Sequence, residues 1–240
     1  MSTEPLETVQ GTSSKASTSE PQVDALVERV RSQAKPVIAG VVVIVLIAVG
    51  YWWYSSTQAE RNAEAATQLS RVRGAFEVGE FNKALVGGDS LPMYGADKVM
   101  GLLDISEQYE GTDAGAIAAL MAGNALANLG RIGEAAAQFE RAQSSDAEVV
   151  KVGAMKGLAL VQEDAGNYAE AATLYEKAAA QGAKTGLEDD CFYKAGLCYE
   201  KAKSNEKAAE MYRTVVKKFE MSESSGLARL GLARLGMGID

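Results

Sequence analysis

Hydrophobic residues follow three different patterns along this chain, and the first is an unbroken apolar run. Residues 36–54, P-V-I-A-G-V-V-V-I-V-L-I-A-V-G-Y-W-W-Y, are nineteen positions without a charge. A helix of this length, rising about 1.5 Å per residue, reaches close to the roughly 30 Å of a bilayer's hydrocarbon core. Proline at the start and Tyr-Trp-Trp-Tyr at the end suit the two ends of a span. We therefore predict a transmembrane helix over residues 36–54.

A cleavable signal peptide also places basic residues before an apolar core. Here thirty-five residues precede the core, and no A-x-A-like site follows it promptly, so an uncleaved anchor is favoured. Three basic residues lie in the fifteen positions before the run and one in the fifteen after, which predicts a cytoplasmic amino terminus. If both windows are extended to twenty residues, Arg71 and Arg73 are added after the run, and the numbers of basic residues before and after it become equal.

Two different segments precede the span. Residues 1–21 are rich in Ser, Thr, Glu and Pro and hold few apolar side chains, which predicts a disordered cytoplasmic tail. In residues 22–35, Val23, Leu26 and Val30 recur at helical spacing. This segment is predicted to be an amphipathic juxtamembrane helix, which either rests on lipid or contacts a partner protein.

The second pattern, in residues 55–113, is helical but interrupted. Apolar residues recur every three or four positions from Thr57 to Val78, and a glycine turn follows at Gly79. Residues 86–96, V-G-G-D-S-L-P-M-Y-G-A, are predicted to form a loop, and residues 97–109 a further helix. We interpret residues 55–113 as a helical linker and a degenerate repeat.

The third pattern, in residues 114–240, is a repeat. Two small positions and one aromatic position recur at steps of 36 and 37 residues, a length that fits two helices and two turns. One such pair cannot bury its own apolar face, so successive copies must stack. The three series are Gly123, Ala159 and Gly196; Ala135, Ala171 and Ala208; and Phe139, Tyr175 and Tyr212.

A closing helix is predicted over Ser222 to Met237, although Gly231 and Gly236 are unfavourable within it. The predicted fold is therefore all-α. It consists of a single transmembrane helix followed by a solenoid of three clear helix pairs, one degenerate pair and a C-terminal capping helix.

The repeats resemble the tetratricopeptide repeat (TPR) family. The middle copy, A-G-N-Y-A-E-A-A-T-L-Y-E-K-A, follows the family pattern most closely. Ile132 stands where an aromatic residue is usual, and Lys203 replaces the turn glycine of the third copy. The resemblance covers roughly residues 60–220, and it implies a TPR-like solenoid that mediates protein-protein interactions.

A narrower resemblance concerns the layout of the chain. A short amphipathic helix containing V-D-A-L, one span ending in G-Y-W-W-Y, an Ala/Glu/Arg-rich helix and then repeats are similar to the ancillary SecYEG translocon subunit family. This resemblance implies a bacterial inner-membrane protein with a cytoplasmic amino terminus and periplasmic repeats. The implied partners are translocon subunits, periplasmic chaperones or exported chains.

Composition narrows the function classes. The net charge of −8 argues against nucleic acid as a partner, and the chain has no histidine, the commonest general base and metal ligand. Cys191 and Cys198 are two helical turns apart without a C-x-x-C pattern, so buried structural thiols are favoured over a redox pair. The acidic residues 188–190 complement a helix dipole better than they form a calcium site. We expect no enzyme activity, cofactor, small-molecule substrate or metal.

A stacked solenoid would present one face of each pair's first helix to a concave groove that could bind a peptide. The alternative is that these are simply solvated helix faces. Two roles fit such a protein: a scaffold that assists protein export or folding at the Sec translocon, or a permanent structural subunit of a larger membrane complex. The candidate groove residues are Leu120, Asn124, Asn128, Lys156, Leu160, Glu163, Asp164, Tyr193, Leu197, Glu200 and Lys201.

Overall fold

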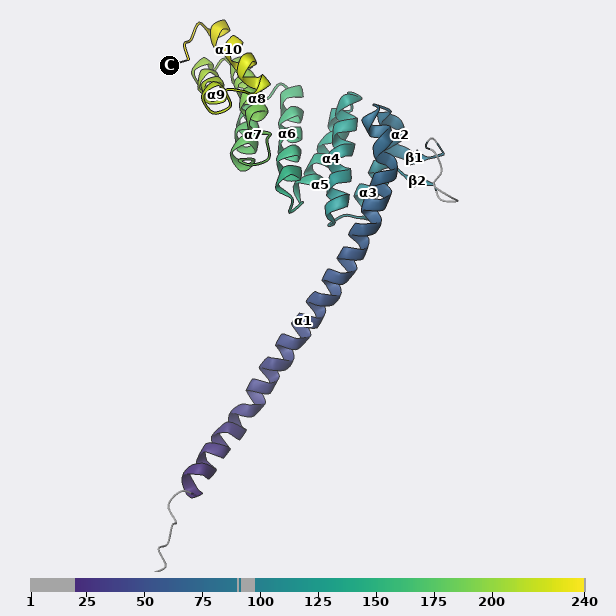
Figure 1. Ribbon diagram of the computed structural model, residues 1–240, viewed down its shortest axis with the longest axis vertical. Coiled ribbons are helices and arrows are strands. Elements are labelled where there is room, and N and C mark those ends of the chain that lie inside the picture. The colour runs from purple at the N-terminus through teal and green to yellow at the C-terminus, as the bar shows by residue number, and fades with distance from the viewer. Residues whose placement is uncertain (1–19, 90, 92–97, 240) are drawn as a thin grey trace, which may run out of the picture. The chain divides into compact units, whose positions relative to one another are not determined.

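The computed structural model describes residues 20–89, 91 and 98–239, with side chains from residue 39 onward. Contacts divide the chain into two units, Met1–Ser55 and Ser56–Asp240. Within the described residues there are ten helices and one two-stranded ribbon, so the predicted all-α, TPR-like solenoid fold is confirmed (Figure 1). The predicted disordered tail lies outside the described residues, apart from the first two residues of α1.

The first helix, α1 (Glu20–Glu77), contains the predicted juxtamembrane helix, span and following helix. It continues through Pro36, so no separate helix begins there. Its part Ala39–Glu77 is long and apolar enough to cross a membrane, and its apolar side chains from Val41 to Tyr54 are exposed. Exposed Val, Ile and Leu side chains of this kind are favourable in lipid. These properties support membrane anchoring through this helix.

The second unit begins with an interrupted helix pair. After α1 come α2 (Phe81–Val86) and α3 (Leu102–Gln108), separated by an insertion whose ends pair as β1 (Gly87–Gly88) and β2 (Val99–Met100). A Cβ on Gly101 would lie 2.2 Å from the carbonyl oxygen of Leu85, so the end of α2 and the start of α3 are in contact. The insertion thus splits one helix into two pieces. The helix predicted over residues 97–109 begins later, because Val99 and Met100 are strand residues.

The remaining helices form the regular part of the solenoid. They pack in chain order, each against the next, as Figure 1 shows from teal to yellow. Three pairs are followed by a single closing helix. The pairs are α4 (Asp113–Asn128) with α5 (Ile132–Gln143), α6 (Glu148–Asp164) with α7 (Tyr168–Gln181), and α8 (Glu188–Lys201) with α9 (Asn205–Lys218); the closing helix is α10 (Glu223–Leu235).

Aromatic rings of the second helices wedge between glycines of neighbouring first helices. Phe139 of α5 is fully buried, and a Cβ on Gly157 of α6 or Gly123 of α4 would lie only 2.4 or 2.6 Å from its ring. Tyr212 of α9 lies in the same way between Gly196 of α8 and Gly231 of α10. Each ring therefore fixes the distance between two successive pairs, because close-packed interiors leave no room for an added methyl group.

The first helix of each clear pair ends in the same left-handed cap. Gly130, with φ 74°, ends α4, and Gly166, with φ 78°, ends α6. At the end of α8 the equivalent residue is Lys203, with φ 59°, the only non-glycine residue with positive φ in the described residues. The amide after it, Ser204 N, donates to the carbonyl of Tyr199 at 2.9 Å. The turn in which Lys203 replaces glycine thus keeps the glycine geometry, at the cost of a strained lysine.

Replacing Lys203 with glycine should therefore stabilise the protein. We expect Lys203→Gly to raise the free energy of unfolding by about 0.5–1 kcal/mol, because glycine adopts positive φ without the Cβ clash. Urea unfolding of the detergent-solubilised chain, followed by circular dichroism, measures the change. As the matched control, Lys177→Gly within α7 should destabilise by about 1 kcal/mol. Equal destabilisation by both substitutions would contradict the strain at Lys203.

Candidate functional site

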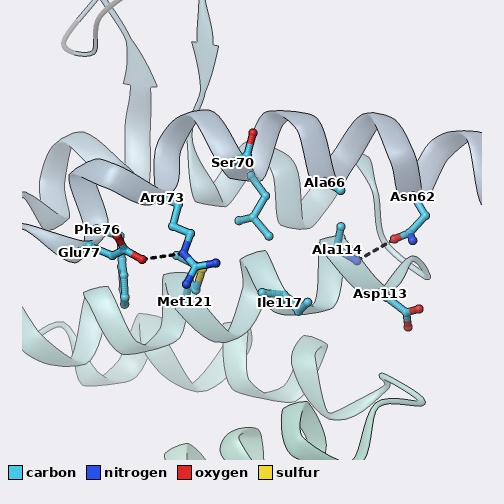
Figure 2. A pocket seen from close by; sticks show the side chains of 11 residues that line it. Asn62, Ala66, Ser70, Arg73, Phe76, Glu77, Asp113, Ala114, Ile117 and Met121 are labelled. Carbon is cyan, nitrogen blue, oxygen red and sulfur yellow. Dashed lines mark hydrogen bonds and ion pairs between the residues drawn. The ribbon is translucent and has the colours of Figure 1, made fainter.

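A recess opens between the last turns of α1 and the first turns of α4. We call it the α1–α4 recess; its volume is about 540 Å³. Figure 2 shows Phe76, Ile117 and Met121 facing it, and Leu69 is also part of its wall. The lining residues of α1 recur every three or four positions, so one face of this helix forms the wall. The recess is therefore mainly apolar.

Two polar contacts frame this recess. Asn62 Oδ1 accepts a hydrogen bond of 2.9 Å from the backbone amide of Ala114, and Arg73 Nε donates one of 2.7 Å to Glu77 Oε1 (Figure 2). The first bond satisfies an amide in the first turn of α4, where backbone donors lack helical partners. It also ties α1 to α4 at one end of the recess.

A second recess lies between α4, α6 and α8. We call it the α4–α6–α8 recess; its volume is about 370 Å³. Four of the predicted groove residues line it: Leu120 and Asn124 of α4, and Lys156 and Leu160 of α6. The structure therefore brings together four of the seven predicted residues of the first two clear pairs. Their role in binding stays a prediction.

The two recesses adjoin on one face of α4. Ile117 and Met121 line the first recess, and Leu120 and Asn124 line the second. Positions 117, 121 and 124 and positions 117, 120 and 124 are each three, four or seven residues apart, so the four residues form one stripe along the helix. We call the two recesses together the inner groove.

Most charged residues predicted to line the groove are engaged in ion pairs between successive pairs of helices. Lys201 of α8 contacts Glu163 of α6 at 2.7 Å, and Asp190 of α8 forms an ion pair with Lys156 of α6. Glu200 of α8 receives two hydrogen bonds from Arg234 of α10, at 2.6 and 2.7 Å. The far part of the predicted groove is therefore bridged by the protein's own side chains.

In two of these ion pairs, the glutamate is also contacted by the hydroxyl of a buried tyrosine. Tyr212 donates a hydrogen bond of 2.9 Å to Glu200, and Tyr175 lies at 3.5 Å from Glu163 in the equivalent place of the preceding pair. Burial raises the pKa of both tyrosines, so each phenol keeps its proton and can donate. Hydrogen bonds from Arg234 hold the pKa of Glu200 below its usual range. We call each arrangement of tyrosine, glutamate and cation a clasp.

The first clear pair has no clasp. Its ring is Phe139, which lacks a hydroxyl, and the position equivalent to Glu163 is Ala127. The groove is consequently open and apolar next to α4, and ion-paired next to α8. Sequence reasoning did not anticipate this difference, because the partner of each charged residue lies 34 to 38 positions away in the chain.

The other predicted groove residues lie outside both recesses. Asp164 is exposed, and the Asn128 side chain donates to the carbonyl of Asn124 at 2.8 Å. The Tyr193 ring packs against that of Tyr212 with 6.0 Å between centroids, and Leu197 packs against the same cluster. Conversely, the prediction omitted the α1 wall. Its signal was the apolar period through Leu69 and Phe76, which was interpreted only as part of a helical linker.

Tetratricopeptide repeat is the family that the comparison with known families finds, over residues 120–185. These residues extend from the middle of α4 to the turn after α7, which includes the α4 and α6 walls of the inner groove. The match supports a TPR protein, and TPR proteins are typically non-enzymatic scaffolds. A search of curated proteins found no match.

Both cysteines are free and buried in α8. Burial raises the pKa of Cys191 to about 11 and that of Cys198 to about 12. The thiolate is the reactive form, so each thiol is inert at neutral pH. Nearby, the acidic residues 188–190 form the first turn of α8, and Asp190 is engaged by Lys156 and by Lys194.

Alkylation should reveal this inertness. At pH 8, we expect iodoacetamide to modify Cys191 and Cys198 at least about tenfold more slowly in the folded chain than in 8 M urea, because an exposed thiol has a pKa of about 8.5. Mass spectrometry measures both rates. The native state holds the two protons to a higher pH, so their contribution to stability is fully present below about pH 8.5 and is lost as pH rises through the raised pKa values of Cys191 and Cys198. Equal rates in both states would contradict the burial.

Proposed function

We propose that this protein is a membrane-anchored scaffold that binds a segment of another protein in the inner groove. The observation that carries the proposal is the pair of adjoining recesses on one face of α4. A groove of this kind suits an amphipathic helix or an extended peptide, whose apolar side chains would occupy the recesses. The TPR match supports a protein as the partner.

The open half of the groove is the proposed binding surface. Leu69 and Phe76 on α1 and Ile117, Leu120 and Met121 on α4 supply its apolar contacts. The clasps at Glu163 and Glu200 act differently, because they join successive helix pairs. They would keep the solenoid at one curvature while a partner binds. Lys156, also predicted as a groove residue, takes part in the same bracing through Asp190.

For location, we propose the bacterial inner membrane, with the amino terminus in the cytoplasm and the repeats in the periplasm. The apolar helix of Ala39–Glu77 supports an anchor. The basic residues before the span and the layout of span, helix and repeats support this orientation. The same layout suggests a role beside the Sec translocon, with translocon subunits, periplasmic chaperones or exported chains as partners.

Site-specific photo-crosslinking in bacterial membranes tests the proposal. A photo-reactive amino acid in place of Ile117 should give discrete crosslinks to translocon subunits, periplasmic chaperones or exported chains, because its side chain lies in the groove. The matched control places the same amino acid at Glu140, an exposed residue of α5 outside both recesses. The products are identified by mass spectrometry.

A second variant separates groove binding from chance proximity. Leu120→Asp should reduce the crosslinks made at position 117 by about tenfold, since a buried charge in an apolar contact costs more than 1.4 kcal/mol. Crosslinks of equal yield from positions 117 and 140, or yields unchanged by Leu120→Asp, would refute groove binding. Groove-dependent crosslinks to proteins outside secretion would keep the scaffold and refute its placement at the translocon.

A further inference from the structure

The closing helix α10 presents an apolar stripe to solvent. Leu227 is 40 % exposed and Leu230 is 64 % exposed, whereas Ala228 and Leu232 on the opposite side are buried. A charged residue stands at each end of the stripe, one helical turn from the nearest leucine. In chain order the stripe consists of Glu223, Leu227, Leu230 and Arg234, whose spacing of four, three and four residues places them on one face.

No described segment covers this stripe. The residues after α10 turn back towards α9, where Arg213 Nε donates a hydrogen bond of 3.0 Å to the carbonyl of Gly238. Gly226, beside the stripe, has nothing within 4 Å of the place its Cβ would occupy. A neighbouring helix could therefore approach closely along this side.

The stripe is complementary to a second copy of itself that runs in the opposite direction. It reads acid, leucine, leucine, base, so a second copy running in the opposite direction would place Leu227 opposite Leu230. The same register would place Glu223 opposite Arg234 at both ends. The spacing matches the alternating core positions of paired helices, in which antiparallel partners meet in such layers. Arg234 already binds Glu200, but its side chain is still half exposed and has further donors available.

We infer that the α10 stripe is a self-association surface, which binds the α10 stripe of a second copy of this chain in antiparallel orientation. This arrangement is an isologous contact, in which one patch meets itself about a two-fold axis. Two leucine layers would form its centre, and two ion pairs would select the antiparallel direction over the parallel one. In the parallel direction Glu223 would meet Glu223 and Arg234 would meet Arg234, which is unfavourable.

The contact is small, so the dimer is weak and reversible. Two short helices bury less area than the roughly 1,200 Å² of a stable complex. Confinement of anchored copies to one bilayer raises their effective concentration, which favours such a contact without new interactions. The stripe belongs to α10, and the inner groove is formed by α1, α4, α6 and α8, so the two surfaces are made of different residues.

Disulfide trapping between two differently tagged full-length copies tests the register. One copy carries Leu227→Cys and the other Leu230→Cys, and both are reconstituted in the same phospholipid vesicles with a mild oxidant. We expect the mixed disulfide to form faster than either disulfide between identical copies, because only the mixed pair is directly opposed. The native cysteines are buried, and the unsubstituted chain serves as the background. Faster trapping between identical copies would overturn the antiparallel register.

Charge reversal tests the surface without introducing a cysteine. In detergent, sedimentation at rising protein concentration should show a monomer-dimer equilibrium that Glu223→Lys weakens by about tenfold. Glu220→Lys, a charge reversal at an exposed residue before α10, should leave it unchanged. Leu230→Asp should abolish it, whereas Val78→Asp, at an apolar residue 73 % exposed outside the stripe, should not. A dimer that survives Leu230→Asp, or a chain that stays monomeric in detergent and also gives no mixed disulfide in vesicles, would overturn the proposal.

Discussion

Close contact between an aromatic ring and the backbone of two helices is the constraint on which this solenoid depends. Phe139 fills the space between the first helices α4 and α6, and Tyr212 that between α8 and the closing helix α10; glycine at the contact points lets the backbones approach each ring. A ring held in this way is buried on both faces, which gives it a large share of the apolar stabilisation of its repeat. It also sets the spacing of the pairs, and therefore the width of the groove between them.

The second level of organisation is polar and differs along the solenoid. Where the ring is a tyrosine, its hydroxyl points to a glutamate that also binds a cation of a later helix, as Tyr212 and Glu200 do with Arg234 of α10. Where the ring is Phe139, no such clasp exists, and the adjoining face of α4 stays open and apolar. The tyrosine hydroxyl and the glutamate that it meets thus distinguish the braced part of the solenoid from the open part, where Phe139 and Ala127 stand instead.

The repeating part of the fold could be predicted from sequence because its signal is periodic. The small and aromatic positions recur at a nearly constant step, and all three aromatic residues are buried as the pattern indicated. Gly231 was counted against a closing helix on propensity alone, yet its contact with Tyr212 explains why glycine stands there. The start of α3 was misplaced, because the pairing of Gly87 and Gly88 with Val99 and Met100 crosses the insertion and leaves no local pattern.

The candidate site was predictable only in part. Helical spacing identified the face of α4 and α6 that lines the second recess, because the side of a helix on which a residue lies follows from its position in the sequence alone. The ion pairs of Lys201 and Glu200 could not be predicted in this way, because they depend on the rotation between successive helix pairs. The wall contributed by α1 was missed for a related reason, as its repeat is interrupted by the insertion.

A double-mutant cycle at the ring contact tests this account most directly. Gly157→Ala, measured by urea unfolding of the full chain in detergent, should cost about 1–3 kcal/mol, because the new methyl group meets the buried ring of Phe139. In a Phe139→Leu background the ring is gone, and the same substitution should cost at least about 1 kcal/mol less. An equal cost in both backgrounds would show that the ring and the glycine do not set the spacing of the helix pairs.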